Sequence, residues 1–203
     1  MIEFEWLLFL AQLPATPSSL RVNAWRRLRD AGSTSLQNGV WILPRNPGNS
    51  LFMERLLATI KQSGASGQIF VVQGLDRAIH EDIIARFKAD REQEYDEFLE
   101  QCGAFLNELE KETRHQKFTF AELEENEQNL QRLRKWITKI QKRDFFRTKK
   151  SQEAVTAFQN CRQRLQNYTR QVYAQEGIET PLDVEILSED AGLEGREENV
   201  DLE

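Results

Sequence analysis

The spacing of hydrophobic positions changes near residue 76 of this 203-residue chain. Before that point, short apolar runs are separated by glycine, proline and asparagine, which is typical of strands and helices that alternate with tight turns. After it, apolar residues recur at intervals of three and four for about a hundred residues, and this period indicates amphipathic helices. The pattern therefore predicts a domain at residues 1–75 and a helical extension at residues 76–175.

The first part contains four predicted strands and two predicted helices. The dipeptide Asn38-Gly39 lies between two of the strands and is a strong hairpin signal, because a type I′ turn needs positive φ at both central residues. The order strand, helix, strand, strand, helix, strand is that of a ferredoxin-like βαββαβ unit, in which two helices cover one face of a four-stranded antiparallel sheet. The strands are predicted at residues 5–13, 35–37, 40–43 and 68–74, and the helices at residues 18–31 and 50–63.

The second part carries three helical patterns joined by short polar links at residues 115–118 and 147–152. Helices with such short connections fold back on each other, so we expect a long three-helix antiparallel bundle or coiled coil and an α+β fold class for the whole chain. The middle helix, predicted over residues 122–146, places Asn126 on its apolar stripe. A buried amide at that position would set the register of the helix against its neighbours.

Charge is distributed unevenly along the chain. The formal net charge is -6, but residues 176–203 alone hold 11 acidic residues and one arginine. The rest of the chain has 26 basic and 22 acidic residues, which gives a net charge of about +4. We expect an acidic, disordered tail at residues 176–203 and a mildly basic body.

The middle helix combines its apolar stripe with a basic face. Nine basic residues lie between Arg132 and Lys150, against the single acid Asp144. At about 100° per residue, five of these cations fall in one sector opposite the stripe, and the helix at residues 18–31 carries a second basic group. We expect these groups to contact nucleic-acid phosphates or another oxyanion. The candidate binding residues are Arg21, Arg26, Arg27, Arg132, Lys135, Lys139, Lys142 and Arg143.

The same residues also fit a structural role. Acids at the start of a helix and cations at its end are stabilised by the helix dipole, so the basic sector can be a solvated helix face. Trp25 and Trp136 both lie beside arginines, and for them too a binding role and a structural role are open. Such a ring can stack on nucleic-acid bases, or it can fill a helix interface while its charged neighbours stay in water.

No combination of residues predicts catalysis. The chain has no phosphate-binding glycine loop, and its two histidines, His80 and His115, are far apart in the pattern. We therefore expect a protein that is not an enzyme and needs no cofactor or metal. Glu122 and Glu125 could share a metal with a partner helix, but no histidine accompanies them, so a solvated helix start is favoured.

The cysteines and the apolar runs predict a cytoplasmic protein. Cys102 and Cys161 have no second thiol nearby in sequence and fall at helix-interior positions, so we expect buried, reduced thiols. The longest apolar run, residues 6–11, is far shorter than the ~20 residues that a membrane-spanning helix needs. No membrane role is expected.

Two stretches of the sequence carry a family resemblance. They are WLLFLAQLPATPSSLRVNAWRRLRDAGSTSLQNGVWILP and FTFAELEENEQNLQRLRKWITKIQKRDFF. Together they resemble the N-terminal domain of the chromate-resistance protein ChrB, and the resemblance extends to about residue 170. The βαββαβ part also resembles the central domain of PaaX-type transcriptional repressors, which is similar to a small CRISPR-associated nuclease. That nuclease has an aspartate at the end of its first strand, where this chain has Gln12 and Leu13, so nuclease activity is not expected.

The resemblance implies a cytoplasmic, dimeric transcriptional regulator of chromate-resistance genes that binds DNA and responds to chromate or another oxyanion. A homodimer is also expected because exposed amphipathic helices leave more apolar surface than a monomer usually shows. Full-length family members carry a C-terminal domain associated with sensing, where this chain has its acidic tail. A second hypothesis is a non-enzymatic helical protein-interaction module whose basic face is only solvated. A third is direct binding of chromate by arginines, in competition with sulfate.

Overall fold

The computed structural model describes residues 4–14 and 18–179, so most of the predicted acidic tail lies outside the described residues. The chain divides into two compact units. The first unit contains the residues up to Arg91 together with Lys142–Arg147, and the second contains Glu92–Gln141 and the residues from Thr148 onwards. Each unit is described separately below.

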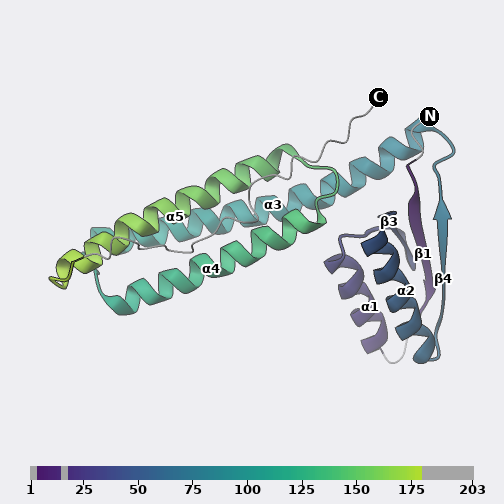
Figure 1. Cartoon of the computed structure of the whole chain (residues 1–203), viewed down its shortest axis with the longest axis horizontal. Helices are drawn as coiled ribbons and strands as arrows, with labels where there is room; N and C mark the ends of the chain where they lie inside the picture. Colours follow the sequence, from purple (N-terminus) through teal and green to yellow (C-terminus); the bar gives the residue numbers. More distant parts are fainter. Residues whose placement is uncertain (1–3, 15–17, 180–203) are drawn as a thin grey trace. The chain divides into compact units, whose positions relative to one another are not determined.

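The first unit is built on a four-stranded sheet. The strand order is β2-β3-β1-β4, and every pair of neighbouring strands is antiparallel. Figure 1 shows α1 and α2 side by side next to this sheet. A mixed α+β fold, with the sheet near the N-terminus and helices after it, is thus confirmed. The elements are β1 (Trp6–Gln12), α1 (Ser18–Asp30), β2 (Thr34–Gln37), β3 (Val40–Pro44), α2 (Pro47–Gln62) and β4 (Ser66–Val72), followed by the start of α3 (Arg77–Arg114).

Two local predictions in this unit are wrong in detail. The hairpin forms at Asn38-Gly39, but among the described residues only the glycine of this pair has positive φ, and the ladder shifts register between Ser35 and Gln37. The turn is therefore not type I′. Helix α2 starts at Pro47, before the predicted residue 50, because the Asn46 side chain caps it by accepting a hydrogen bond from the Asn49 amide at 2.8 Å.

The two faces of the sheet are covered differently. Leu7, Phe9 and Leu43 are buried in one core with residues of α1 and α2. On the opposite face, Trp6 stacks on Phe87 of α3, with ring centroids 5.7 Å apart. The beginning of α3 thus covers one end of the face that α1 and α2 leave open.

The segment after α4 (Phe120–Arg143) also packs into the first unit. The helix predicted over residues 122–146 ends at Arg143, and Phe146 lies 5.4 Å from Phe87 and 5.9 Å from Trp6 between ring centroids. The first unit therefore extends beyond the predicted boundary at residue 75 and includes a segment that is distant in sequence.

The second unit consists of three helices around one hydrophobic core: the later part of α3, then α4 and α5 (Lys149–Gln175). In Figure 1, α4 runs opposite to α3 and α5. Cys102 and Cys161 are buried in this core as free thiols, which confirms their predicted burial. No helix in the described part of the chain is long and apolar enough to cross a membrane.

Asn126 is buried among the apolar residues of α4, as its place on the stripe predicts. Its Nδ2 donates a hydrogen bond of 2.7 Å to Oε2 of Glu112 on α3, and another of 2.9 Å to the carbonyl oxygen of Glu122. Since Glu112 is itself buried, the amide provides a donor that the carboxylate could not obtain from water.

Candidate nucleic-acid interface

Helix α1 presents arginines and a tryptophan on its outer face. Ala24 and Leu28 are buried against the sheet, and the side of the helix away from them is exposed. Trp25 is 46% exposed, and the guanidinium carbon of Arg29 lies 5.3 Å from the centroid of its ring. The interpretation of Trp25 as a ring that fills a helix interface is therefore wrong, because the indole is at the surface and forms a cation–π contact.

The three candidate arginines of α1 differ in their contacts. Nη2 of Arg21 donates to the carbonyl oxygen of Pro14 at 3.2 Å, and Nη1 of Arg27 donates to Oγ1 of Thr59 on α2 at 3.3 Å. Arg26 is exposed and makes no hydrogen bond or ion pair within residues 4–14 and 18–179. Of the three, Arg26 can thus bind an external anion without giving up a contact inside the protein.

The outer face of α4 carries the second group of cations. Arg132, Lys135 and Lys139 are all exposed and lie opposite the stripe that includes Leu130 and Ile137. Nη1 of Arg132 donates to Oδ1 of Asn129, one turn earlier, at 3.1 Å. The other two side chains make no polar contact in the described part of the chain, and the three cations span about 10 Å along the helix. This spacing gives the second unit a linear basic face.

Arg143 does not belong to that exposed face. Its side chain is only 14% exposed, and its Nη1 lies 3.5 Å from the carbonyl oxygen of Arg29 and 3.9 Å from Oδ1 of Asp30. The guanidinium therefore compensates the negative end of the α1 dipole. Its neighbour Lys142 is exposed. The candidates Arg21, Arg26, Arg27, Lys142 and Arg143 thus lie in the first unit, and the other three lie in the second.

Comparison with known proteins gives the family. A family model described as "Protein ChrB, N-terminal" matches residues 21–179. The chain belongs to this family. One relative, Protein ChrB from Cupriavidus metallidurans, is 30% identical over 97 residues, which are 48% of this chain and 29% of that protein. The chain thus spans less than a third of the length of this ChrB relative. No solved structure matches the chain.

The ChrB N-terminal match contains both basic faces, since it begins at Arg21 in α1 and ends beyond α5. The sequence places Arg21, Arg26, Arg27 and Arg29 on the outer side of this helix, but Arg29 was not among the candidate binding residues. The signal was present, because Trp25 and Arg29 are four residues apart and so are neighbours on a helix surface. Trp136 differs from Trp25: it packs against the core and meets Phe98 edge to face at 5.7 Å, so the helix-interface interpretation is correct for this ring.

The acidic residues that the structure describes form no evident metal centre. Within the residues that the structure describes, no three His, Cys, Asp or Glu side chains are grouped so as to hold a metal ion. Glu122 lies 3.4 Å from the ammonium group of Lys117. The pKa of Glu112 is raised, mainly by burial and further by the nearby Glu122 and Glu108, while the Asn126 hydrogen bond opposes this shift.

Proposed function

We propose that this member of the ChrB N-terminal family is a regulator that binds DNA, with the exposed cations of α1 and α4 as its phosphate contacts. The observation that carries the proposal is the outer face of α1. A solvated helix gains nothing from exposing a tryptophan, whereas Trp25 with Arg29 against its ring and Arg26 nearby offers an aromatic surface beside positive charge.

The proposal includes a more specific fold for the first unit. The element order βαββαβ and the strand order β2-β3-β1-β4 support a ferredoxin-like arrangement, as expected from the sequence. It also includes the setting of the regulator, chromate resistance in the cytoplasm, which the family membership supports. Chromate is proposed as the effector because guanidinium groups bind tetrahedral oxyanions through paired hydrogen bonds.

Charge reversal on each face tests the DNA proposal. We expect Arg26→Glu and Lys139→Glu to weaken binding to duplex DNA of any sequence and to flatten the dependence of log affinity on log salt by about one unit each, because each lost phosphate contact releases one counterion fewer. Fluorescence anisotropy at several salt concentrations measures both quantities. Repeating the titration with chromate, and with sulfate as the matched dianion, tests the effector.

Lys88→Glu is the matched control. Lys88 is an exposed residue of α3 in the first unit and makes no polar contact among the described residues, so its reversal changes the net charge equally while leaving both proposed faces intact. If the Arg26 and Lys139 variants keep their helical circular dichroism and bind DNA like the Lys88 variant, the basic faces are solvated helix surfaces. The protein-interaction module would then be the better account of this chain.

A further inference from the structure

Among the residues that the structure describes, strand β4 forms an unpaired edge of the sheet. It pairs with β1 on one side along its whole length, from Trp6 opposite Val72 to Gln12 opposite Ser66, and the strand order leaves its other side at the edge. The seven residues SGQIFVV contain no charge and no proline. Natural sheets usually protect an edge with charged residues or proline, because an open edge pairs with other strands.

The opposite edge of the same sheet is protected. Strand β2 is four residues long, and its pairing with β3 is interrupted by a register shift between Ser35 and Gln37. A short, irregular strand is a poor template for further pairing. The contrast shows that β4 is the side of the sheet that is suited to receive another strand.

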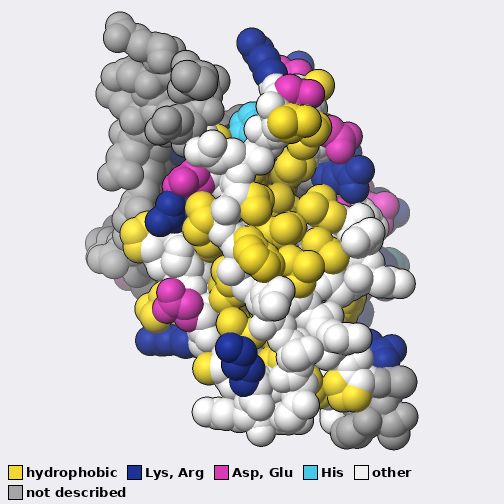
Figure 2. All heavy atoms as spheres, turned by 90° about the vertical axis from the view of Figure 1, so that its right-hand side faces the viewer, with side chains coloured by type: hydrophobic (Ala, Val, Ile, Leu, Met, Phe, Trp, Pro, Cys, Tyr) yellow, Lys and Arg dark blue, Asp and Glu magenta, His cyan; other side chains and the backbone are white. Residues whose placement is uncertain are grey.

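The side chains of β4 remain accessible although half of the strand is strongly apolar. No residue of β4 is fully buried, and Phe70 and Val71, which point to opposite faces of the sheet, are 45% and 49% exposed. Figure 2 views the molecule from the side on which β4 lies in Figure 1 and shows hydrophobic side chains gathered on this face. A strand added at the edge would place side chains beside Phe70 on one face of the sheet and beside Val71 on the other.

The order of large and small residues in β4 determines which strand fits. Its first three residues, Ser66, Gly67 and Gln68, are small or polar, and its last three, Phe70, Val71 and Val72, are large and apolar. In an antiparallel pair with an identical strand centred on Ile69, each of the last three residues is opposite a small or polar one, Val71 faces the glycine, and Ile69 faces its own copy. A parallel pair would put large residues against large ones.

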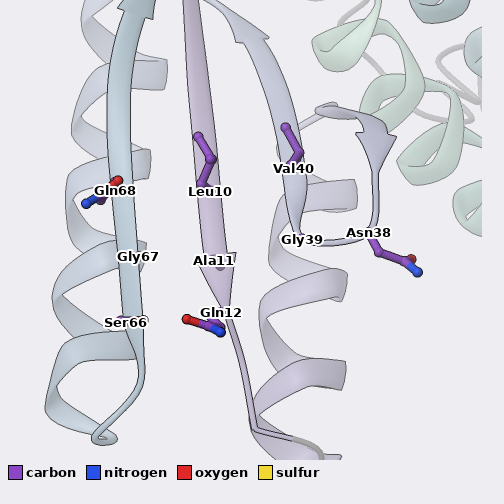
Figure 3. A pocket seen from close by; sticks show the side chains of 9 residues that line it. All are labelled: Leu10, Ala11, Gln12, Asn38, Gly39, Val40, Ser66, Gly67 and Gln68. Atoms are coloured by element: carbon purple, nitrogen blue, oxygen red, sulfur yellow. The ribbon is translucent and has the colours of Figure 1, made fainter.

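A hollow lies beside the first residues of β4, on the side towards β1 and the turn between β2 and β3. It has a volume of about 380 Å³ and lies across the ends of three strands. Figure 3 shows Gly67, which has no side chain, between Ser66 and Gln68 along this edge. Leu10 and Val40 contribute apolar surface. The full lining is Leu10, Ala11, Gln12, Asn38, Gly39, Val40, Ser66, Gly67 and Gln68.

We propose that β4 pairs with β4 of a second copy of this chain, antiparallel and about a twofold axis at Ile69, so that two four-stranded sheets join into one. A neutral edge brings no like charges together, and a twofold contact is self-complementary, as the large and small halves of this strand are. The contact is short, so the dimer is weak and depends on concentration, at the low end of specific interfaces. This inference does not depend on DNA binding.

Sedimentation velocity over a hundredfold concentration range, without DNA, measures the dimer. We expect Phe70→Lys and Val71→Lys to raise the dimer dissociation constant by at least about tenfold, because a lysine on an edge strand opposes pairing. The matched control is Val22→Lys on α1, where the same residue type is 40% exposed. A dimer that both β4 variants leave unchanged, or that the Val22 variant weakens equally, overturns the proposal, as does a wild-type chain that stays monomeric.

Cross-linking tests the register without relying on a lysine variant that folds. A chain with Gln68→Cys, mixed with a chain with Phe70→Cys under mild oxidation, should form a disulfide between copies, because these positions are opposite each other in the proposed pair. Each chain mixed with a Val22→Cys chain should give much less cross-linked dimer. Equal yields in all three mixtures would contradict the antiparallel pairing about Ile69.

Discussion

Asn126→Leu is the substitution that most directly tests how α3 and α4 are held together. Leucine fills a similar volume, so the main change is that the buried carboxylate of Glu112 loses a donor at 2.7 Å. A hydrogen bond to a charged group contributes about 1.5 to 3 kcal/mol, and an unsatisfied buried partner costs a similar amount. We expect the free energy of unfolding to fall by about 2 to 3 kcal/mol. For a unit of this size, the melting temperature would then fall by on the order of 10 °C.

This cost should depend on pH in a defined direction. Burial, with smaller contributions from Glu122 and Glu108, raises the folded-state pKa of Glu112 above its unfolded value of about 4.3. The folded state therefore binds the proton more tightly, and stability falls as pH rises from the unfolded pKa through the folded pKa, then levels off. Asn126→Leu should lower the free energy of unfolding most at pH values above the folded-state pKa of Glu112, where this carboxyl group is ionised. Its cost should shrink as acid protonates the carboxyl group.

Glu112→Gln provides the control. The glutamine keeps an oxygen that can accept from the Asn126 amide but removes the buried charge, so we expect a variant at least as stable as the wild type near neutral pH. In this background Asn126→Leu should cost about 1 to 2 kcal/mol less than in the wild type. Urea denaturation followed by circular dichroism between pH 4.5 and 8 measures all four chains. An Asn126→Leu cost that is equal at every pH, or equal in both backgrounds, would refute the role assigned to the pair.

Two further predictions concern buried thiols and one glycine. Cys102 and Cys161 should react slowly with a thiol reagent in the native protein, because both side chains are buried. Rapid labelling of both without denaturant would contradict this packing. Gly32→Ala should lower the free energy of unfolding by about 2 to 3 kcal/mol, because its φ is +81° and a Cβ would lie 2.8 Å from Cβ of Arg143. Gly64→Ala is the control, since its φ is +76° but a Cβ there meets nothing within 4 Å. We expect it to lower the free energy of unfolding by only about 1 kcal/mol. Equal losses of unfolding free energy in the two variants would show that the contact with Arg143 is unimportant.

Hydropathy period together with turn residues predicted most of the elements, because most of the helices bury one side and the strands are separated by glycine, proline and asparagine. It could not predict which core an apolar residue joins. Phe145 and Phe146 continue the apolar spacing of α4, so the sequence indicated a helix through residue 146. In the structure both rings contact Phe87 instead, and the helix stops at Arg143. That contact spans more than fifty residues and leaves no local sequence signal.

The candidate site was predictable to the same extent. The helical sector correctly placed Arg132, Lys135 and Lys139 on the exposed face of α4, because the apolar stripe opposite them is unambiguous. Trp25 and Trp136 could not be separated in this way, since both lie beside arginines. Their difference depends on what packs over each ring: Phe98 lies against Trp136, whereas Trp25 is 46% exposed.

The contacts of the eight candidate cations predict the salt dependence of DNA binding. Arg143 is turned towards α1, and Arg21 and Arg27 donate to groups on other segments of the first unit. Arg132 also donates a hydrogen bond, but only to Asn129 one turn earlier on its own helix, so it is counted as available for DNA. At about 0.9 unit per neutralised phosphate, eight contacts would give a slope near -7, whereas the remaining five would give at most about -4.5. A duplex bound only by the first unit would use two of them, with a slope near -2, and one bound only by the second would use three, with a slope near -3. The measured slope therefore shows whether one unit or both contact DNA, and a value near -7 would mean that the internal contacts break on binding. The five cations are Arg26, Arg132, Lys135, Lys139 and Lys142.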